Sequence, residues 1–266
     1  MMKFNGFLTI IYKERIQEDV FQIRVTRSES VGSILPGQFF NITTTKIGYP
    51  LLRRPISVSK IGDDYIEFTI KVVGTGTQAL MAFEVGDSIE MMGPLGNGFD
   101  LKCLEGKHKK NVLLVGGGIG VAPIKGLMEH LVSEGHTLDT ILGFRDDPYL
   151  EDGFLSQCSS CTIVSEYASN YKQGYVTEPF VEAIDEKNYD MIFACGPEVM
   201  LKTLAQKANS KGVPIQLLME EKMACGIGAC LVCTCKQRDG EFGYKHVRMC
   251  KDGPMFYGSE VMFDEA

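Results

Sequence analysis

The sequence has no apolar run near the ~20 residues that a membrane-spanning helix requires, so we expect no such helix. Its N-terminal stretch, MMKFNGFLTIIYKERIQED, has one short apolar run. Polar and charged residues follow it, without the small-residue cleavage site of a secretion signal. The chain also has no excess of positive charge, since its formal net charge is -7. This charge argues against nucleic acid or an acidic membrane as the main partner. These absences together predict a cytoplasmic protein.

The sequence gives little evidence for acid–base catalysis, because none of the four histidines lies in a recognisable acid–base motif. We therefore assign no catalytic residue. A disulfide framework is equally unexpected, because thiols stay reduced in the cytoplasm and the nine cysteines are an odd number.

The order of the apolar patterns predicts three domains. Residues 1–104 alternate in short β-branched stretches between turn residues, with one helix expected at 77–85, which is typical of an antiparallel β-barrel. Residues 105–218 instead alternate apolar strands with helical segments, which predicts a parallel α/β sheet covered on both faces. Residues 219–266 have little regular pattern and hold five of the nine cysteines. The predicted fold class is multidomain, with an all-β, an α/β and a small cysteine-rich part.

The C-terminal cysteines have a spacing that indicates a metal centre. C-x4-C-x2-C, with a fourth cysteine after sixteen further residues, is the plant-type [2Fe-2S] spacing. Small residues between the first two cysteines let the backbone pass close to a cluster and turn its N–H groups inward. Tetrahedral zinc is the alternative, although zinc knuckles usually have a second close pair, which is missing here. The predicted ligands are Cys225, Cys230, Cys233 and Cys250, and we expect Cys235 to be a neighbour outside the ligand set.

A glycine-rich stretch predicts a second kind of site. NVLLVGGGIGVAPIKGLMEH has the pattern of a strand, a glycine turn and a helix, and such a turn lets the backbone and the helix N-terminus approach a diphosphate. Val121 holds the place of the third glycine of a G-x-G-x-x-G motif, so a plain tight turn is the alternative. The predicted contacts are Gly116, Gly117, Gly118 and Gly120.

Two stretches of the β-rich part are candidate phosphate sites. In LLRRPISVS, an arginine within a strand can hold a phosphate bidentately with a serine beside it, and a solvated edge arginine is the alternative. In KVVGTGTQAL, glycines and Thr77 precede a helix, where N–H groups bind phosphate or Thr77 only caps the helix.

The order of these motifs resembles the ferredoxin reductase family. Its members have an FAD-binding β-barrel with an R-P-[aromatic or aliphatic]-S box, followed by an NAD(P) domain with a G-G-G-x-G-x-x-P turn and a late C-G-P. This chain has Arg54-Pro55-Ile56-Ser57, then GGGIGVAP, then Cys195-Gly196-Pro197. MEEKMACGIGACLVC and RMCKDGPMF narrow the resemblance to the iron–sulfur electron-transfer subunits of NAD-linked, class 1B dihydroorotate dehydrogenases, and it spans nearly the whole chain.

The resemblance implies an order of electron carriers and their contacts. NAD(H), FAD and a [2Fe-2S] cluster would exchange electrons with the FMN of a separate catalytic subunit, which oxidises dihydroorotate to orotate in pyrimidine biosynthesis. Two copies of each chain would form the complex. One departure lies at residues 166–174, where EYASNYKQG replaces the D-G-S-x-G-x-x-G that such subunits often carry. The implied FAD contacts are Arg54, Pro55, Ile56, Ser57, Ile70, Lys71, Val72, Gly76 and Thr77, and Cys195, Gly196 and Pro197 would lie beside the nicotinamide.

A partner surface is expected from the C-terminal apolar residues. This segment has little periodic core for them to enter, so some should cover the cluster and a surplus should form an exposed patch. The residues concerned are Met249, Met255, Phe256, Tyr257, Val261, Met262 and Phe263.

Several alternatives stay open from the sequence. The chain could serve another redox complex, such as a hydrogenase or a ferredoxin-NADP oxidoreductase, or it could be a non-enzymatic zinc module. The cosubstrate is also open, because GFRDDPY offers Arg145 to a 2′-phosphate and Asp146 and Asp147 to a free ribose hydroxyl. We interpret the stretch as favouring NAD.

Overall fold

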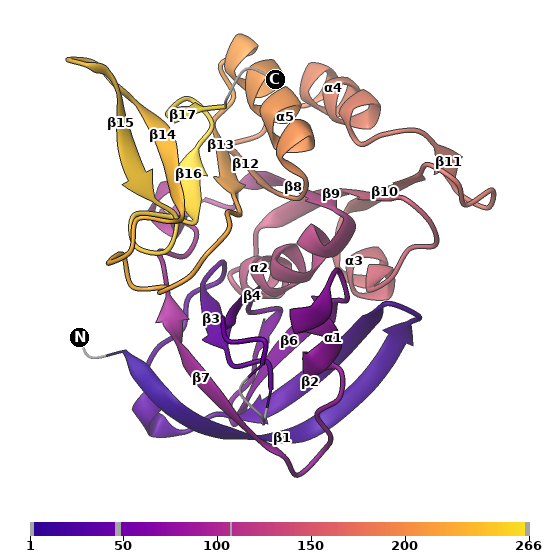
Figure 1. Cartoon of the computed structure of the whole chain (residues 1–266). Helices are drawn as coiled ribbons and strands as arrows, with labels where there is room; N and C mark the ends of the chain where they lie inside the picture. The colour runs from indigo at the N-terminus through magenta and orange to yellow at the C-terminus, as the bar shows by residue number, and fades with distance from the viewer. Residues whose placement is uncertain (1–2, 46–48, 107, 264–266) are drawn as a thin grey trace.

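The computed structural model describes residues 3–45, 49–106 and 108–263. The outer limits of the first and last expected domains, residues 1 and 266, lie outside the described residues. Three sheets organise the chain, and Figure 1 shows a curled β-layer, drawn in indigo to magenta, beneath an α/β layer. No helix among the described residues is long and apolar enough to span a membrane.

The first sheet is antiparallel and curled into a half-barrel, in the strand order β4-β3-β7-β1-β2-β6-β5. The expected antiparallel barrel is thus confirmed as a fold, with β4 and β5 as the two ends of the sheet. Period-two alternation packs one face of the strands into a shared core that includes Phe21, Phe40 and Phe68. The strands are β1 (Phe4–Gln17), β2 (Val20–Thr26), β3 (Phe39–Ile42), β4 (Arg54–Ser57), β5 (Lys60–Ile61), β6 (Tyr65–Lys71) and β7 (Ser88–Leu95).

The one helix of this part, α1 (Thr75–Leu80), starts and ends earlier than the expected 77–85. It ends because Ala82 and Phe83 donate to the carbonyls three residues back, which tightens the last turn.

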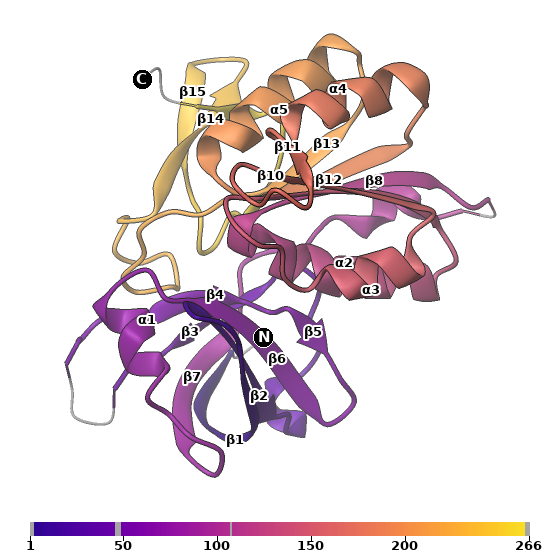
Figure 2. The same cartoon turned by 90° about the vertical axis from the view of Figure 1, so that its right-hand side faces the viewer.

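The second sheet is parallel and covered on both faces, as the apolar runs predict, except for its antiparallel edge strand β16 (Met255–Tyr257). Leu114 faces a core shared with α2 and α3, whereas Leu113 and Val115 face a core shared with α4 and α5, and Figure 2 shows the two helix layers. Its strand order is β11-β10-β9-β8-β12-β13-β16. The elements are β8 (Asn111–Gly117), β9 (Thr137–Phe144), β10 (Ser160–Ser165), β11 (Lys172–Gln173), β12 (Met191–Cys195), β13 (Ile215–Leu218), α2 (Val121–Ser133), α3 (Glu151–Gln157), α4 (Thr177–Glu186) and α5 (Glu198–Ser210).

Helix α3 was not expected from the sequence. It has seven residues and only Phe154 among them is buried, so it shows no amphipathic repeat. Within the described ranges, three short 3-10 turns complete the helical elements, at η1 (Glu29–Val31), η2 (Leu101–Leu104) and η3 (Gly118–Gly120).

The C-terminal segment has more regular structure than its pattern suggested. A hairpin of β14 (Thr234–Asp239) and β15 (Gly243–Arg248) pairs with β17 (Val261–Met262) in a third sheet. Most β14 and β15 side chains are at least partly exposed, so neither strand shows the alternation that identifies a half-buried strand. Strand β16 (Met255–Tyr257) instead pairs antiparallel with β13, which joins this segment to the α/β sheet.

An ion network joins the half-barrel to α2. Glu67 of β6 is 0% exposed, and its carboxylate lies 2.9 Å from the Arg24 guanidinium and 3.2 Å from the Lys125 ammonium. Beside it, a Cβ on Gly126 would lie 2.8 Å from the Ser59 carbonyl oxygen. Buried charges are retained where they are paired, so this contact holds the two layers in one relative position.

Candidate functional site

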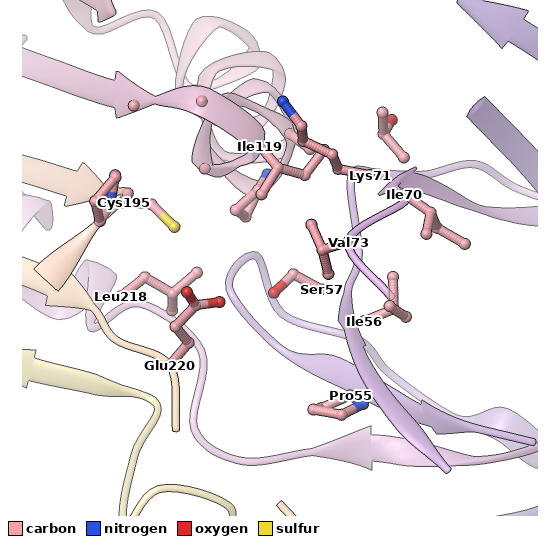
Figure 3. A pocket seen from close by; sticks show the side chains of 18 of the residues that line it. Pro55, Ile56, Ser57, Ile70, Lys71, Val73, Ile119, Cys195, Leu218 and Glu220 are labelled. Carbon is pink, nitrogen blue, oxygen red and sulfur yellow. The ribbon is translucent and has the colours of Figure 1, made fainter. Parts of the chain in front are cut away.

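A cavity of about 400 Å³ lies between the half-barrel and the α/β layer. Figure 3 shows its two walls, with Ser57, Ile56 and Ile70 on the half-barrel side facing Cys195 and Glu220 on the other. Thirteen of the sixteen FAD and NAD contacts predicted from the sequence line it: Arg54, Pro55, Ile56, Ser57, Ile70, Lys71, Thr77, Gly117, Gly118, Gly120, Cys195, Gly196 and Pro197. Val72, Gly76 and Gly116 are outside this lining.

Gly76 nevertheless shapes the cavity through Arg54. A Cβ on Gly76 would overlap the Arg54 guanidinium, so the absence of a side chain there lets Arg54 lie against α1. The Arg54 Nη1 donates to the Leu52 carbonyl at 2.5 Å, which leaves its other nitrogens for an anion. Thr77 is used differently, because its Oγ1 accepts from the Val73 N–H at 2.9 Å and the Gly74 N–H at 3.3 Å. Thr77 is thus the third residue of α1 rather than a residue before the helix, the N-cap is Gly74, and the contact of Thr77 with FAD stays a prediction.

The glycine turn, residues 116–120, is pressed against the end of β12. A Cβ on Gly120 would overlap the Cys195 carbonyl oxygen, and one on Gly117 would lie 2.5 Å from the Met200 sulfur. Gly118 has φ +53°, a backbone conformation that favours glycine. The turn thus needs its glycines for close packing as well as for an approach to phosphate.

Several cavity residues were missed in the sequence. Leu218, Met219 and Glu220 follow β13 and reach the cavity because β13 lies beside β12 in the sheet. Burial, and then the nearby charge of Glu221, raises the pKa of Glu220 above its ordinary value. Burial also raises the pKa of the Cys195 thiol, so it stays neutral. The other cavity residues that were not predicted as contacts are Thr69, Val73, Ile119, Ala122 and Pro123, although the last three lie within the GGGIGVAP stretch.

The cluster loop, residues 223–233, carries three of the four predicted ligands. Burial acts to raise the pKa of the Cys225 thiol, but hydrogen bonds from the Ile227 and Cys230 N–H groups outweigh it and lower the pKa to about 6. The Ala229 N–H donates to the same sulfur at 3.3 Å. Such N–H groups aimed at a thiolate suit an anionic metal–sulfur group.

The fourth ligand is brought in by the hairpin. Thr234 of β14 pairs with Arg248 of β15, so the residues just outside this pair meet, and the Cys250 N–H lies 3.5 Å from the Cys233 sulfur. Burial, and then the neighbouring Cys233, raises the pKa of Cys250 to about 12. In the ranges that the structure describes, no three His, Cys, Asp or Glu side chains already form one metal-holding group. The thiols instead form two neighbouring pairs, Cys225 with Cys230 and Cys233 with Cys250, a donor set whose chemistry fits a thiolate-bound cluster.

Cys235 is placed on β14 opposite Val247 and packs against the adjoining core. Burial raises its pKa to about 11. Cys233 and Cys250 share this core, so the exclusion of Cys235 from the ligand set rests on the C-x4-C-x2-C spacing and stays a prediction.

The expected apolar patch is formed by different residues. Of the residues expected to form the patch, Met249, Phe256 and Val261 are buried and the others are half-buried. They therefore cover the core rather than form a patch. Phe242 and Tyr244 are exposed on the hairpin, and the exposed large apolar side chains beside the cysteines are Ile227, Leu231 and Val232, on the cluster loop. The sequence-based expectation of where the patch lies was therefore wrong. These three flank the cysteines, where inward-facing N–H groups turn their side chains outward.

Loop 166–174 lies at the β10–β11 end of the sheet. Tyr167 stacks under the Arg145 guanidinium at 5.7 Å, and the Tyr175 hydroxyl donates to the Glu166 carboxylate at 3.3 Å. Arg145 thus contacts this loop, which also contributes the Glu166 carboxylate, and the choice between NAD and NADP stays a prediction.

A curled antiparallel sheet and a parallel α/β sheet that share one cavity, followed by a thiol-rich segment, define a ferredoxin-reductase-type flavoprotein with an iron–sulfur module. A family model described as an oxidoreductase FAD-binding domain matches residues 8–99. A second, described as the iron–sulfur cluster binding domain of dihydroorotate dehydrogenase B, matches residues 220–262.

Curated relatives are similar over nearly their full length. The dihydroorotate dehydrogenase B (NAD(+)) electron transfer subunit of Clostridium acetobutylicum is 37% identical, and the match covers 94% of each chain. That of Clostridium perfringens is 37% identical, with 95% of this chain and 98% of the relative covered. This chain belongs to the family of dihydroorotate dehydrogenase B (NAD(+)) electron transfer subunits.

A solved structure is similar as well. A chain of the NADH-dependent reduced ferredoxin-NADP oxidoreductase, described in connection with flavin-based electron bifurcation, superposes with a TM-score of 0.81 at 29% identity. The match covers 96% of this chain and 89% of that one.

Proposed function

We propose that this chain carries electrons between NAD(H) and a [2Fe-2S] cluster by way of FAD, for a catalytic subunit that converts dihydroorotate to orotate. Residues 1–104 would hold FAD, residues 105–218 NAD(H), and residues 219–266 the cluster. When bound, FAD exchanges two electrons at once with a nicotinamide and single electrons with an iron–sulfur centre.

One observation in particular supports the order NAD(H), FAD and [2Fe-2S] cluster. A second cavity, of about 440 Å³, adjoins the first and shares Pro55, Ser57, Met219 and Glu220 with it. Its far wall includes Met223 and Met249, which come two residues before Cys225 and one before Cys250. Pro55 and Ser57 of the strand that would hold the flavin, Arg54–Ser57 (the flavin strand), therefore line both the first cavity and the one that reaches the neighbours of the cysteines.

The residues of the chain would position these groups. Arg54 offers a guanidinium to the FAD diphosphate, and Lys71 adds a second positive charge to the same wall. The glycine turn presents backbone N–H groups and the start of α2 to the NAD diphosphate. Cys195 and Glu220 form the wall opposite Ser57, where a nicotinamide would meet the flavin.

The names of the relatives imply a catalytic partner subunit. We infer that this partner holds FMN, that two copies of each chain assemble, and that the complex serves pyrimidine biosynthesis in the cytoplasm. Ile227, Leu231 and Val232 support a contact beside the cluster, because exposed apolar side chains next to a redox centre suit an interface.

The test is dihydroorotate-dependent NAD reduction, with the chain alone and with the catalytic subunit added. The isolated chain should reduce dyes with NADH and leave dihydroorotate unchanged, and the second activity should require the FMN subunit. Turnover of dihydroorotate by the chain alone would refute the carrier role.

The similarity to the ferredoxin-NADP oxidoreductase chain supports a second candidate, an electron carrier in another flavin-dependent complex. Purification of the chain from its own cells separates the two. Co-elution with an FMN protein that oxidises dihydroorotate favours the first, and co-elution with a ferredoxin-oxidising flavoprotein favours the second.

A further inference from the structure

Asn41 is a polar residue on an otherwise apolar face of the half-barrel. The alternation of β3 turns Phe40 and Ile42 into the half-barrel core, so Phe39 and Asn41 face outward. Phe39 belongs instead to the core that holds Cys233 and Cys250. Asn41 is only 1% exposed, because the cluster loop covers it.

The Asn41 amide contacts the backbone on both sides of Cys225. Its Nδ2 donates to the Ala224 carbonyl at 3.4 Å, and a Cβ on Gly226 would lie 2.8 Å from the same nitrogen. The other two side chains that such a Cβ would meet, Leu95 and Met92, are apolar. Gly226 has φ +72°, so the loop turns sharply where it passes the amide.

The same residue lies beside the flavin strand. Asn41 pairs with Pro55 across β3 and β4, and Pro55 lines both cavities. One side chain therefore connects the strand expected to hold the flavin with the backbone of a predicted cluster ligand.

Packing alone does not account for an amide here. Asn41 Oδ1 is buried without a hydrogen-bond partner, one of two such side-chain atoms in the described part of the chain. A buried acceptor without a partner destabilises a protein, and an apolar residue of similar shape would avoid this.

We propose that Asn41 is a positioning residue for the iron–sulfur cluster, which holds the Cys225 turn on the flavin strand and helps to set the reduction potential of the cluster. The nitrogen of the amide, its positive end, faces the turn. Fixed dipoles and hydrogen bonds around the sulfurs are among the determinants of such potentials. The inference rests on the proposed function only for the presence of a cluster at the four cysteines.

The test uses Asn41→Leu and Asn41→Asp in the full-length chain. Leucine removes the dipole while it fills the space, and aspartate replaces the amide with a negative group. The matched control is Thr44→Val, because Thr44 is fully buried nearby but its hydroxyl donates to the Pro50 carbonyl rather than to the cluster loop. Three quantities are measured: iron and sulfide content, the midpoint potential of the cluster by EPR-monitored reduction, and the rate of cluster loss in a chelator.

We expect both variants to have a more negative midpoint potential than wild type, Asn41→Asp more than Asn41→Leu, because the reduced cluster carries the extra negative charge. Cluster loss should be roughly tenfold faster, the lower end of the effect of removing an outer-shell partner. Asn41→Leu should unfold at the wild-type temperature or above it, and Thr44→Val should keep the wild-type potential.

Wild-type potential and chelator resistance in both Asn41 variants would overturn the proposal and leave Asn41 a packing residue. An equal shift in Thr44→Val would overturn it too, because any loosening of the half-barrel would then suffice. Absence of iron from the wild-type chain would instead refute the cluster of the proposed function, so the two failures are distinguishable.

Discussion

The Arg54 guanidinium lies in the space that a side chain at position 76 would occupy. Gly76→Ala should therefore displace the guanidinium, which is the far end of a flexible side chain, while the fold stays intact. We expect FAD affinity to fall at least tenfold and the unfolding temperature of the apoprotein to stay near that of wild type. Fluorescence titration with FAD and thermal unfolding measure the two. Gly240→Ala is the control, because a Cβ there meets no atom within 4 Å and the residue does not line the cavity, and it should bind FAD normally.

Replacement of Arg54 itself should weaken FAD binding further. Arg54→Ala should weaken FAD binding by about 2 kcal/mol or more, the range for a lost charge-assisted contact. Equilibrium dialysis gives the value. Arg53→Ala is a matched control, because Arg53 pairs with Glu90 at 2.8 Å and does not line the cavity. Equal affinities of Arg54→Ala and wild type would identify Arg54 as a solvated edge residue.

The cysteine assignment predicts that five serine variants differ in whether they retain the cluster. Cys225→Ser, Cys230→Ser, Cys233→Ser and Cys250→Ser should each lose the cluster, because each removes one thiolate of the donor set. Cys235→Ser should retain it, since the C-x4-C-x2-C spacing leaves Cys235 outside the ligand set. Iron and acid-labile sulfide analysis decides. Normal iron in Cys250→Ser, or zinc in the wild type, would contradict the assignment.

The glycine turn should tolerate no side chain at position 120. Gly120→Ala would drive a Cβ into the Cys195 carbonyl oxygen, so backbone rather than a flexible side chain must move. Overpacking of this kind destabilises by about 1–3 kcal/mol, and we expect NADH binding to weaken roughly tenfold while FAD stays bound. Stopped-flow reduction by NADH measures the first and the flavin spectrum the second. Gly153→Ala in α3, where a Cβ meets only atoms at 3.8 Å or beyond, should react like wild type.

The exposed residues of the cluster loop should carry the partner contact. Leu231 is 62% exposed and Val232 is 52% exposed. Leu231→Asp and Val232→Glu should abolish co-purification with the catalytic subunit, because a charge would be buried in the interface. Leu155→Glu on α3 places the same charge on a remote exposed leucine and should leave the complex intact. Iron content must stay normal in all three, and full assembly of Val232→Glu would remove this surface from the interface.

Motifs whose geometry is local could be predicted from the sequence. C-x4-C-x2-C, R-P-I-S and the glycine turn each place their residues within one loop or one strand, so residue type and spacing are sufficient. The same holds for the change from alternating to helical apolar patterns, which separates the half-barrel from the α/β sheet. Short or exposed elements such as α3 and the β14–β15 hairpin could not be predicted from the sequence, because so few of their side chains are buried.

Only the tertiary structure decided which distant residues meet. Pairing of β14 with β15 sets Cys250 beside Cys233, and the position of β13 next to β12 brings Glu220 opposite Ser57. Asn41 shows no motif in the sequence, and its contact with the Cys225 turn depends on how the cluster loop packs on the half-barrel. Local spacing encodes a loop, but contacts between sheets depend on packing and strand register, which are properties of the whole fold.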